Sequence, residues 1–250
     1  MNHDLIRRQL APTGVLRAAI NLSNFLLVTG KASNGDPVGV SPDLARHIAD
    51  RLGVPVSYVC YLSPGVLADA VDNDEWDIGN IGAEPQRAQS IAFTAAYCEI
   101  EATYLVPAGS PITDIASVDR PGVRIAVAGR AAYGLWLADH IEHAELVTTD
   151  SLDDSFQVFV DRGLEVLAGL RPRLLTDVRK LPGARILDGR FTSVQQAVGT
   201  PRRHVEAAAW LADQVEQAKA SGLIAELIAR HSVDGLSVAP AAKRRATGTP

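Results

Sequence analysis

The sequence predicts an α/β protein built of two lobes with a ligand cleft between them. Strand and helix patterns alternate along residues 15–81, and the same alternation recurs along residues 123–187. Two extended segments, near residues 99–106 and 193–199, can join the lobes. Paired crossing strands of this kind predict closure about a hinge.

The first alternation has the pattern of parallel strands joined by right-handed crossovers. Its longer helix carries an apolar stripe at helical spacing and is followed by Gly53, a typical helix end. The expected elements are a strand at 15–21, a helix at 41–52, a strand at 54–60, a helix at 66–71 and a strand at 77–81.

The second alternation repeats this architecture without a clear sequence repeat. The expected elements are strands at 123–127, 146–148, 165–168 and 185–187, with helices at 131–141 and 151–160. A strand at 194–199 then returns to the first lobe, and helices follow at 205–220 and 223–230.

These elements predict a discontinuous first lobe of residues 1–100 and 197–240. The second lobe is expected to be residues 101–196, and residues 241–250, rich in small side chains, a disordered tail. In such an arrangement the loops at the carboxyl ends of the strands face the cleft, where a small molecule binds.

Composition excludes several classes of function. The 250 residues are 47% hydrophobic and 21% charged with a net charge of −5, which argues against a nucleic-acid surface. No apolar run reaches the roughly 20 residues that span a bilayer. Cys60 and Cys98 are too few for a disulfide framework, and no Cys/His spacing resembles a metal site. We therefore expect neither a metal nor a cofactor.

Residues 1–10 predict the cellular location. They contain two arginines but no following apolar segment and no small-residue cleavage site, so they do not resemble a secretory signal. We expect a cytoplasmic protein, with the periplasm as the alternative if an export signal has been removed.

The most informative stretch is Trp76–Arg87, an apolar strand followed by a glycine-bearing loop. Pro85 suits the first position of a helix, which would carry Arg87 in its first turn. Free N–H groups and the helix dipole at such an N-terminus favour an anion. Because arginine can grip a carboxylate with two parallel hydrogen bonds, the stretch predicts a carboxylate-binding site.

Together with other segments, this stretch resembles the extracellular solute-binding proteins of the polar amino-acid type, family 3, which have the type II periplasmic-binding fold. The resemblance covers about residues 14–240 and rests on Gly14–Arg17, Gly39–Ala45, Arg51–Val56, Trp76–Ile78, Pro85–Arg87, Ile91–Thr94 and Tyr97. It implies a bilobed binder that closes on a small solute and, if exported, serves an ABC permease.

The resemblance also implies roles for individual residues. Arg87 matches the arginine that holds the ligand's carboxylate, and Asn80 and Gly82 match the loop that completes that site. Phe25 lies near the position of an aromatic wall, and the loop from Gly129 to Ala132 matches the contribution of the second lobe. Two further residues are pocket candidates: Asn24, as a donor, and Tyr133, in the first turn of the second-lobe helix.

The sequence departs from the family pattern in the second lobe. The acid that holds a ligand's ammonium should fall near Gly169–Leu170, which is apolar here and is followed by Arg171. Arg130 stands where a small residue is common. These departures favour a ligand with more than one negative group, or one that lacks the ammonium. Three carboxylates could supply a relocated acid: Glu84, Glu99 and Glu101.

Alternatives remain for several residues and for the function. Arg130 either joins the ligand or points to solvent, Arg171 either binds or packs, and Phe25 is either a core residue or a ligand wall. The alternative function is a lyase that resembles the cyclohexadienyl dehydratases, with Arg87 anchoring the substrate and Glu101 or Glu99 moving protons. No residue constellation indicates catalysis, so we place binding first.

Overall fold

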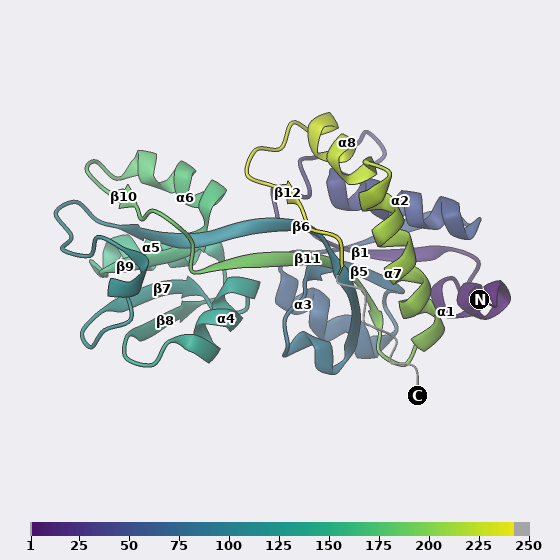
Figure 1. Ribbon diagram of the computed structural model, residues 1–250, viewed down its shortest axis with the longest axis horizontal. Helices are drawn as coiled ribbons and strands as arrows, with labels where there is room; N and C mark the ends of the chain where they lie inside the picture. Colours follow the sequence, from purple (N-terminus) through teal and green to yellow (C-terminus); the bar gives the residue numbers. More distant parts are fainter. Residues whose placement is uncertain (1, 243–250) are drawn as a thin grey trace.

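The computed structural model describes residues 2–242 and consists of two lobes joined by two long strands (Figure 1). The predicted two-lobed α/β fold is therefore observed. One sheet runs through both lobes in the order β4-β1-β5-β11-β6-β9-β7-β8, and β10 and β12 also pair with β6. A separate small sheet contains β2 and β3. Residues 243–250 of the expected tail lie outside the described residues.

The strands and helices agree with most of the expected segments to within a few residues. The strands are β1 Leu16–Asn21, β2 Gly30–Lys31, β3 Pro37–Val38, β4 Val56–Tyr61, β5 Ile78–Gly82, β6 Ile91–Val106, β7 Arg124–Ala128, β8 Glu145–Thr149, β9 Val166–Leu170, β10 Arg185–Ile186, β11 Thr192–Pro201 and β12 Ser237–Val238. The helices are α1 His3–Leu10, α2 Val40–Leu52, α3 Pro64–Asp69, α4 Ala132–His140, α5 Leu152–Asp161, α6 Arg171–Asp177, α7 Val205–Ala220 and α8 Leu223–Arg230.

The two crossing strands predicted from the sequence are β6 and β11. They pair antiparallel from Thr192 opposite Ala102 to Pro201 opposite Ile91. The register shifts on either side of Ala197, and such irregularities bend a strand locally. Both strands pass from one lobe into the other (Figure 1), so the sheet is continuous across the cleft.

The first lobe has parallel strands β4, β1 and β5, with cores on both faces of the sheet. Successive side chains of a strand point to opposite faces. Ile78 of β5 accordingly joins the larger core with Leu44 and Ile48 of α2, and Ile81 joins a smaller core with Leu67 and Trp76. Packing on both faces of the sheet fixes these strands, and their carboxyl ends lie at the cleft.

The second lobe repeats the arrangement with parallel strands β9, β7 and β8. Helices α4, α5 and α6 surround these strands (Figure 1). Two helices of the molecule were not predicted, α1 and α6. Helix α1 has eight residues and buries only Ile6 and Leu10, so few apolar positions mark it in the sequence.

The prediction of an α-helix after Pro85 is wrong. Residues 83–90 form a turn with a short 3₁₀ segment, Arg87–Gln89, in which Ser90 donates its N–H to the carbonyl of Arg87. The reason is tertiary, because β5 ends at Gly82 and β6 already pairs with β11 at Ile91. Only a compact turn fits between these two paired strands.

Gly39 provides a test of backbone packing at the start of α2. Its φ is +152°, and a Cβ atom there would lie 2.3 Å from the carbonyl oxygen of Leu27. We expect Gly39→Ala to lower the free energy of unfolding by about 1–3 kcal/mol, measured by urea denaturation. Gly30→Ala is the control, since its added Cβ would meet nothing within 4 Å. Equal losses in both variants would contradict the argument.

Candidate ligand-binding site

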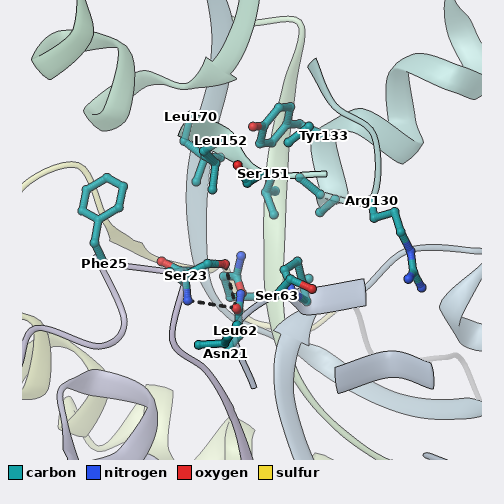
Figure 2. A pocket seen from close by; sticks show the side chains of 18 of the residues that line it. Asn21, Ser23, Phe25, Leu62, Ser63, Arg130, Tyr133, Ser151, Leu152 and Leu170 are labelled. Carbon is teal, nitrogen blue, oxygen red and sulfur yellow. Dashed lines mark hydrogen bonds between the residues drawn. The ribbon is translucent and has the colours of Figure 1, made fainter. Parts of the chain in front are cut away.

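A cavity of about 90 Å³ lies between the lobes (Figure 2). This is well below the roughly 300–1,000 Å³ of sites for drug-sized ligands, so the cavity suits a small solute. From the first lobe it is lined by Asn21, Ser23, Asn24, Phe25, Leu62, Ser63, Pro64, Gly82 and Arg87. The rest of the lining is Ala128, Arg130, Ala131, Ala132, Tyr133, Asp150, Ser151, Leu152, Leu170, Val194 and Gln196.

Arg87 is the buried cation of this cavity. It is 7% exposed, and it donates from Nη1 to the carbonyl of Gly82 at 2.8 Å and from Nη2 to that of Arg130 at 2.9 Å. Burial lowers the pKa of Arg87 to about 10, so the guanidinium is charged at neutral pH. A guanidinium has five N–H donors, and these two bonds leave others for an anion.

Helix α4 begins beside Arg87 and adds backbone donors. Its N-cap, Ala131, makes no side-chain hydrogen bond to the first turn, so the first backbone N–H groups of the helix need other partners. Ala131, Ala132 and Tyr133 all line the cavity. The helix N-terminus that accompanies Arg87 therefore comes from the second lobe, and the one predicted at Pro85 does not exist.

Gly82 allows the lobes to approach closely. A Cβ atom at Gly82 would lie 2.7 Å from the Cβ of Ala132 and 3.3 Å from Cγ1 of Val194. Contacts this short do not occur between real methyl groups, so only glycine fits here. The close approach brings the first turn of α4 against the end of β5.

Two asparagines of the first lobe, Asn21 and Asn24, line the cavity and have amino groups that can donate hydrogen bonds. The Oδ1 atom of Asn21 accepts from the N–H of Ser23 at 3.1 Å, and that of Asn24 accepts from the N–H of Leu26 at 3.3 Å. Because backbone N–H groups need an oxygen acceptor, these bonds fix the orientation of both amides. Gln196, 4% exposed, also lines the cavity.

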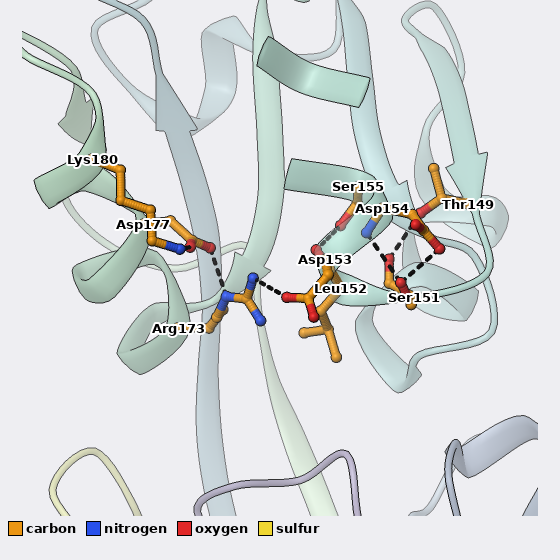
Figure 3. Close-up of polar contacts among 9 residues, drawn as sticks. All are labelled: Thr149, Ser151, Leu152, Asp153, Asp154, Ser155, Arg173, Asp177 and Lys180. Carbon is orange, nitrogen blue, oxygen red and sulfur yellow. Dashed lines mark hydrogen bonds and ion pairs between the residues drawn. The ribbon is translucent and has the colours of Figure 1, made fainter. Parts of the chain in front are cut away.

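The second lobe forms an apolar wall held by an ion-pair network. Leu152 of α5 and Leu170, at the end of β9, line the cavity. Arg173 of α6 bonds Asp177 and Asp153 of α5, each at 2.7 Å (Figure 3). Asp177 is 1% exposed, so this network fixes α6 against α5 and thereby positions the wall.

Polar contacts join the lobes at the mouth of the cavity. Nη2 of Arg130 lies 2.7 and 2.8 Å from the two carboxylate oxygens of Asp69. Gln86 donates to Asp139 at 2.5 Å. Arg130 lines the cavity, but its guanidinium points away from Tyr133 and the other labelled residues (Figure 2). Its charge is thus directed to the rim.

The structure brings together six of the predicted site residues and separates four from the cavity. The six are Asn24, Phe25, Gly82, Arg87, Arg130 and Tyr133. The four that do not line it are Asn80, Glu84, Gly129 and Arg171. Their roles in binding stay predictions.

Each of these four has a structural setting of its own. Asn80 is 2% exposed within β5, and Gly129 donates its N–H to the carbonyl of Thr149. Arg171 pairs with Glu101 at 2.8 Å and lines a second cavity. Burial raises the pKa of Glu84 to about 7.

Sequence analysis missed several lining residues. They include Leu62, Ser63, Asp150, Ser151 and Gln196. Four of these follow the ends of β4 and β8, which is where ligands bind at an α/β sheet, so the expected strand ends could have indicated them. Gln196 lies within β11, and no local pattern marks it as a cleft residue.

A comparison with protein families decides the relationship. Residues 24–233 match the model of the bacterial extracellular solute-binding proteins, family 3. The chain belongs to this family. Among curated proteins, none is significantly similar to this solute-binding protein in sequence.

Solved structures share the fold of this solute-binding protein. A mutant of ArgBP from T. maritima has a TM-score of 0.72 at 19% identity, over 94% of this chain and 100% of that one. A solute receptor for L-cysteine of Neisseria gonorrhoeae has a TM-score of 0.72 at 18% identity, over 91% and 92% of the two chains.

A third similar structure is an ancestral amino acid-binding protein described as a precursor of cyclohexadienyl dehydratase. It has a TM-score of 0.70 at 20% identity, over 92% of this chain and 99% of that one. Likeness at this level of identity shows a shared two-lobed fold and leaves the ligand open. In residues 2–242 we find no helix with the length and apolar character of a membrane span.

The raised pKa of Glu84 predicts a pH-dependent stability. Between its ordinary value of 4.5 and about 7, the folded state holds a proton that the unfolded state has lost, so stability falls as pH rises through this window. We expect Glu84→Gln to reduce the fall in Tm between pH 5 and pH 8, measured by calorimetry. The exposed Glu142→Gln is the control. Identical pH profiles of wild type and Glu84→Gln would contradict the assignment.

The close approach at Gly82 predicts a binding defect on substitution. In Gly82→Ala the added methyl group would meet Ala132 of the other lobe, so the lobes could not approach as closely around the cavity. We expect affinity for a ligand of this cavity to fall about tenfold or more, with a smaller change in unfolding free energy, measured by titration calorimetry and urea denaturation. Adding Ala132→Gly should restore affinity, and failure of this rescue would argue against the contact.

Proposed function

We propose that this protein closes on a small carboxylate-bearing metabolite other than an ordinary α-amino acid. The observation that carries the proposal is the guanidinium of Arg87, 7% exposed and hydrogen-bonded to backbone carbonyls of both lobes. A buried cation needs an anionic partner, and neither carbonyl supplies the full charge. A carboxylate in the cavity would do so while contacting the first turn of α4.

The surroundings of Arg87 disfavour a ligand with an ammonium group. The second-lobe lining includes the apolar side chains of Leu152 and Leu170, and the one carboxylate in the described lining is Asp150, which is exposed and follows β8. Glu84 does not line the cavity. These facts support the anionic ligand predicted from the sequence.

Closure would occur about the crossing strands. We place the lobe boundaries at residues 100/101 and 196/197, because the register of β11 on β6 shifts between Gln196 and Ala197. The contacts of Arg130 with Asp69 and of Gln86 with Asp139 would form on closing. A permease of an ABC transporter is the partner that this mode of binding implies. The cytoplasmic location expected from residues 1–10 stays a prediction, and the family's extracellular character favours the export alternative.

The lyase alternative has less support. Glu99 and Glu101 line the second cavity, which meets the Arg87 cavity at Phe25. Glu101 is paired with both Arg171 and Arg190. A carboxylate held by two cations beside a different cavity is poorly placed to move protons on a substrate anchored by Arg87.

The test is a thermal-shift screen of carboxylic acids and amino acids, followed by calorimetry on wild type, Arg87→Ala and Arg87→Lys. We expect Arg87→Ala to lower the affinity of any hit by about 30-fold or more, since hydrogen bonds to a charged group contribute ~2 kcal/mol. Arg87→Lys should retain part of the affinity because it keeps the charge. Arg162→Ala, which removes an exposed arginine outside the cavity lining, should leave binding unchanged. An unchanged affinity in Arg87→Ala would refute the site.

A further inference from the structure

We infer that the cleft selects α-keto acids over the corresponding α-amino acids. This inference rests on the proposed function, in which Arg87 holds the ligand's carboxylate. It concerns the group on the neighbouring carbon atom of the ligand, which is an oxygen acceptor in a keto acid and a cationic donor in an amino acid. The hydrogen-bonding capacity of the cavity decides between them.

Two asparagines of the first lobe offer hydrogen-bond donors to the cavity. Asn21 and Asn24 are each at most 9% exposed, and the amide oxygen of each accepts a hydrogen bond from a local backbone N–H. Their amino groups have no hydrogen-bond partner within residues 2–242. Each amino group carries two donors and no acceptor. These amino groups can therefore donate to a ligand oxygen and cannot accept from an ammonium.

The remaining polar groups of the cavity include a charged donor and, apart from the exposed Asp150, neutral acceptors. Arg87 and the first turn of α4 supply N–H groups alone. The Oγ of Ser23 donates its hydrogen to Asn21 and keeps its lone pairs, and the Oγ of Ser63 accepts from the N–H of Val66. The buried hydroxyl of Tyr133 has no partner among the described residues. Gln196 offers one amide oxygen. A buried ammonium would meet neutral oxygens there, and no buried carboxylate of the described lining would balance its charge.

The charges of the cavity point the same way. The guanidinium of Arg87 lies inside it, and the carboxylate of Asp150 is exposed at its edge. An ammonium beside Arg87 would be desolvated next to a like charge. A keto oxygen meets neither penalty and accepts from an asparagine amino group. The apolar wall of Leu152 and Leu170 suits an aliphatic or aromatic body of the ligand.

The experiment compares ligands that differ only at this carbon atom. Calorimetric titrations use the keto acids of alanine, leucine and phenylalanine, the three L-amino acids, and propanoate, isocaproate and hydrocinnamate, which carry neither group. In at least one set we expect the keto acid to bind at least tenfold more tightly than the amino acid, with the unsubstituted acid between them. If an amino acid binds most tightly, the inference is wrong and so is the exclusion of ordinary α-amino acids from the proposed function, whereas the carboxylate site at Arg87 stands. If none of the nine carboxylates binds, the inference is wrong, and the wider thermal-shift screen decides whether the Arg87 site binds another carboxylate.

A variant of Asn24 tests the mechanism. Asn24→Asp keeps the oxygen that accepts from Leu26 and replaces the amino donor with an acceptor. We expect it to weaken keto-acid binding about tenfold and to strengthen amino-acid binding, which reverses or narrows the preference. A purely structural role would weaken both ligands alike, and that result would overturn the inference.

Two further variants complete the test. Asn34→Asp makes the same change at an exposed position outside the cavity and should leave both affinities unchanged. Asp150→Asn should leave the order of ligands unchanged. If Asp150→Asn instead abolishes a preference for an amino acid, Asp150 holds the ammonium and the inference falls.

Discussion

The structure depends on the antiparallel pairing of β6 with β11. These two strands belong to one sheet that runs through both lobes. The lobes are therefore connected through paired strands. Because the two strands pair with each other along the connection, their backbone N–H and C=O groups form hydrogen bonds within the sheet. In an irregular linker these groups would bond to water. The register shifts around Ala197 lie next to Gln196, which lines the cavity. The cleft is thus built into the sheet.

Within this frame, Arg87 organises the cleft. Its bonds to Gly82 and to Arg130 tie the end of β5 to the loop before α4. The absence of a side chain at Gly82 lets the two segments meet, since a methyl group would collide with Ala132. A buried cation, a helix N-terminus and a glycine therefore act as one unit. The bond from Arg87 to Arg130 and the approach of Gly82 to Ala132 both require the lobes to lie close together.

The sequence predicted most elements because strand and helix periods are local properties. It also predicted that Arg87 lies at a cleft, from the strand and glycine loop before it. The helix after Pro85 was a wrong prediction, because the pairing of β6 at Ile91 overrides local helical preference. Helix α6 and the partly buried Arg173–Asp177 pair were missed, although Pro172 stands in the first turn of the helix, a position typical of a helix start.

By itself, therefore, the sequence determined the alternation of strands and helices, the two halves and the arginine near the cleft, because each depends on neighbouring residues. The tertiary structure decided which groups face the ligand. It turned Arg130 outward to Asp69 and brought Gln196 into the lining. These outcomes depend on register and on the approach of segments 40 or more residues apart, as with Arg87 and Arg130. Local periodicity does not encode such distances.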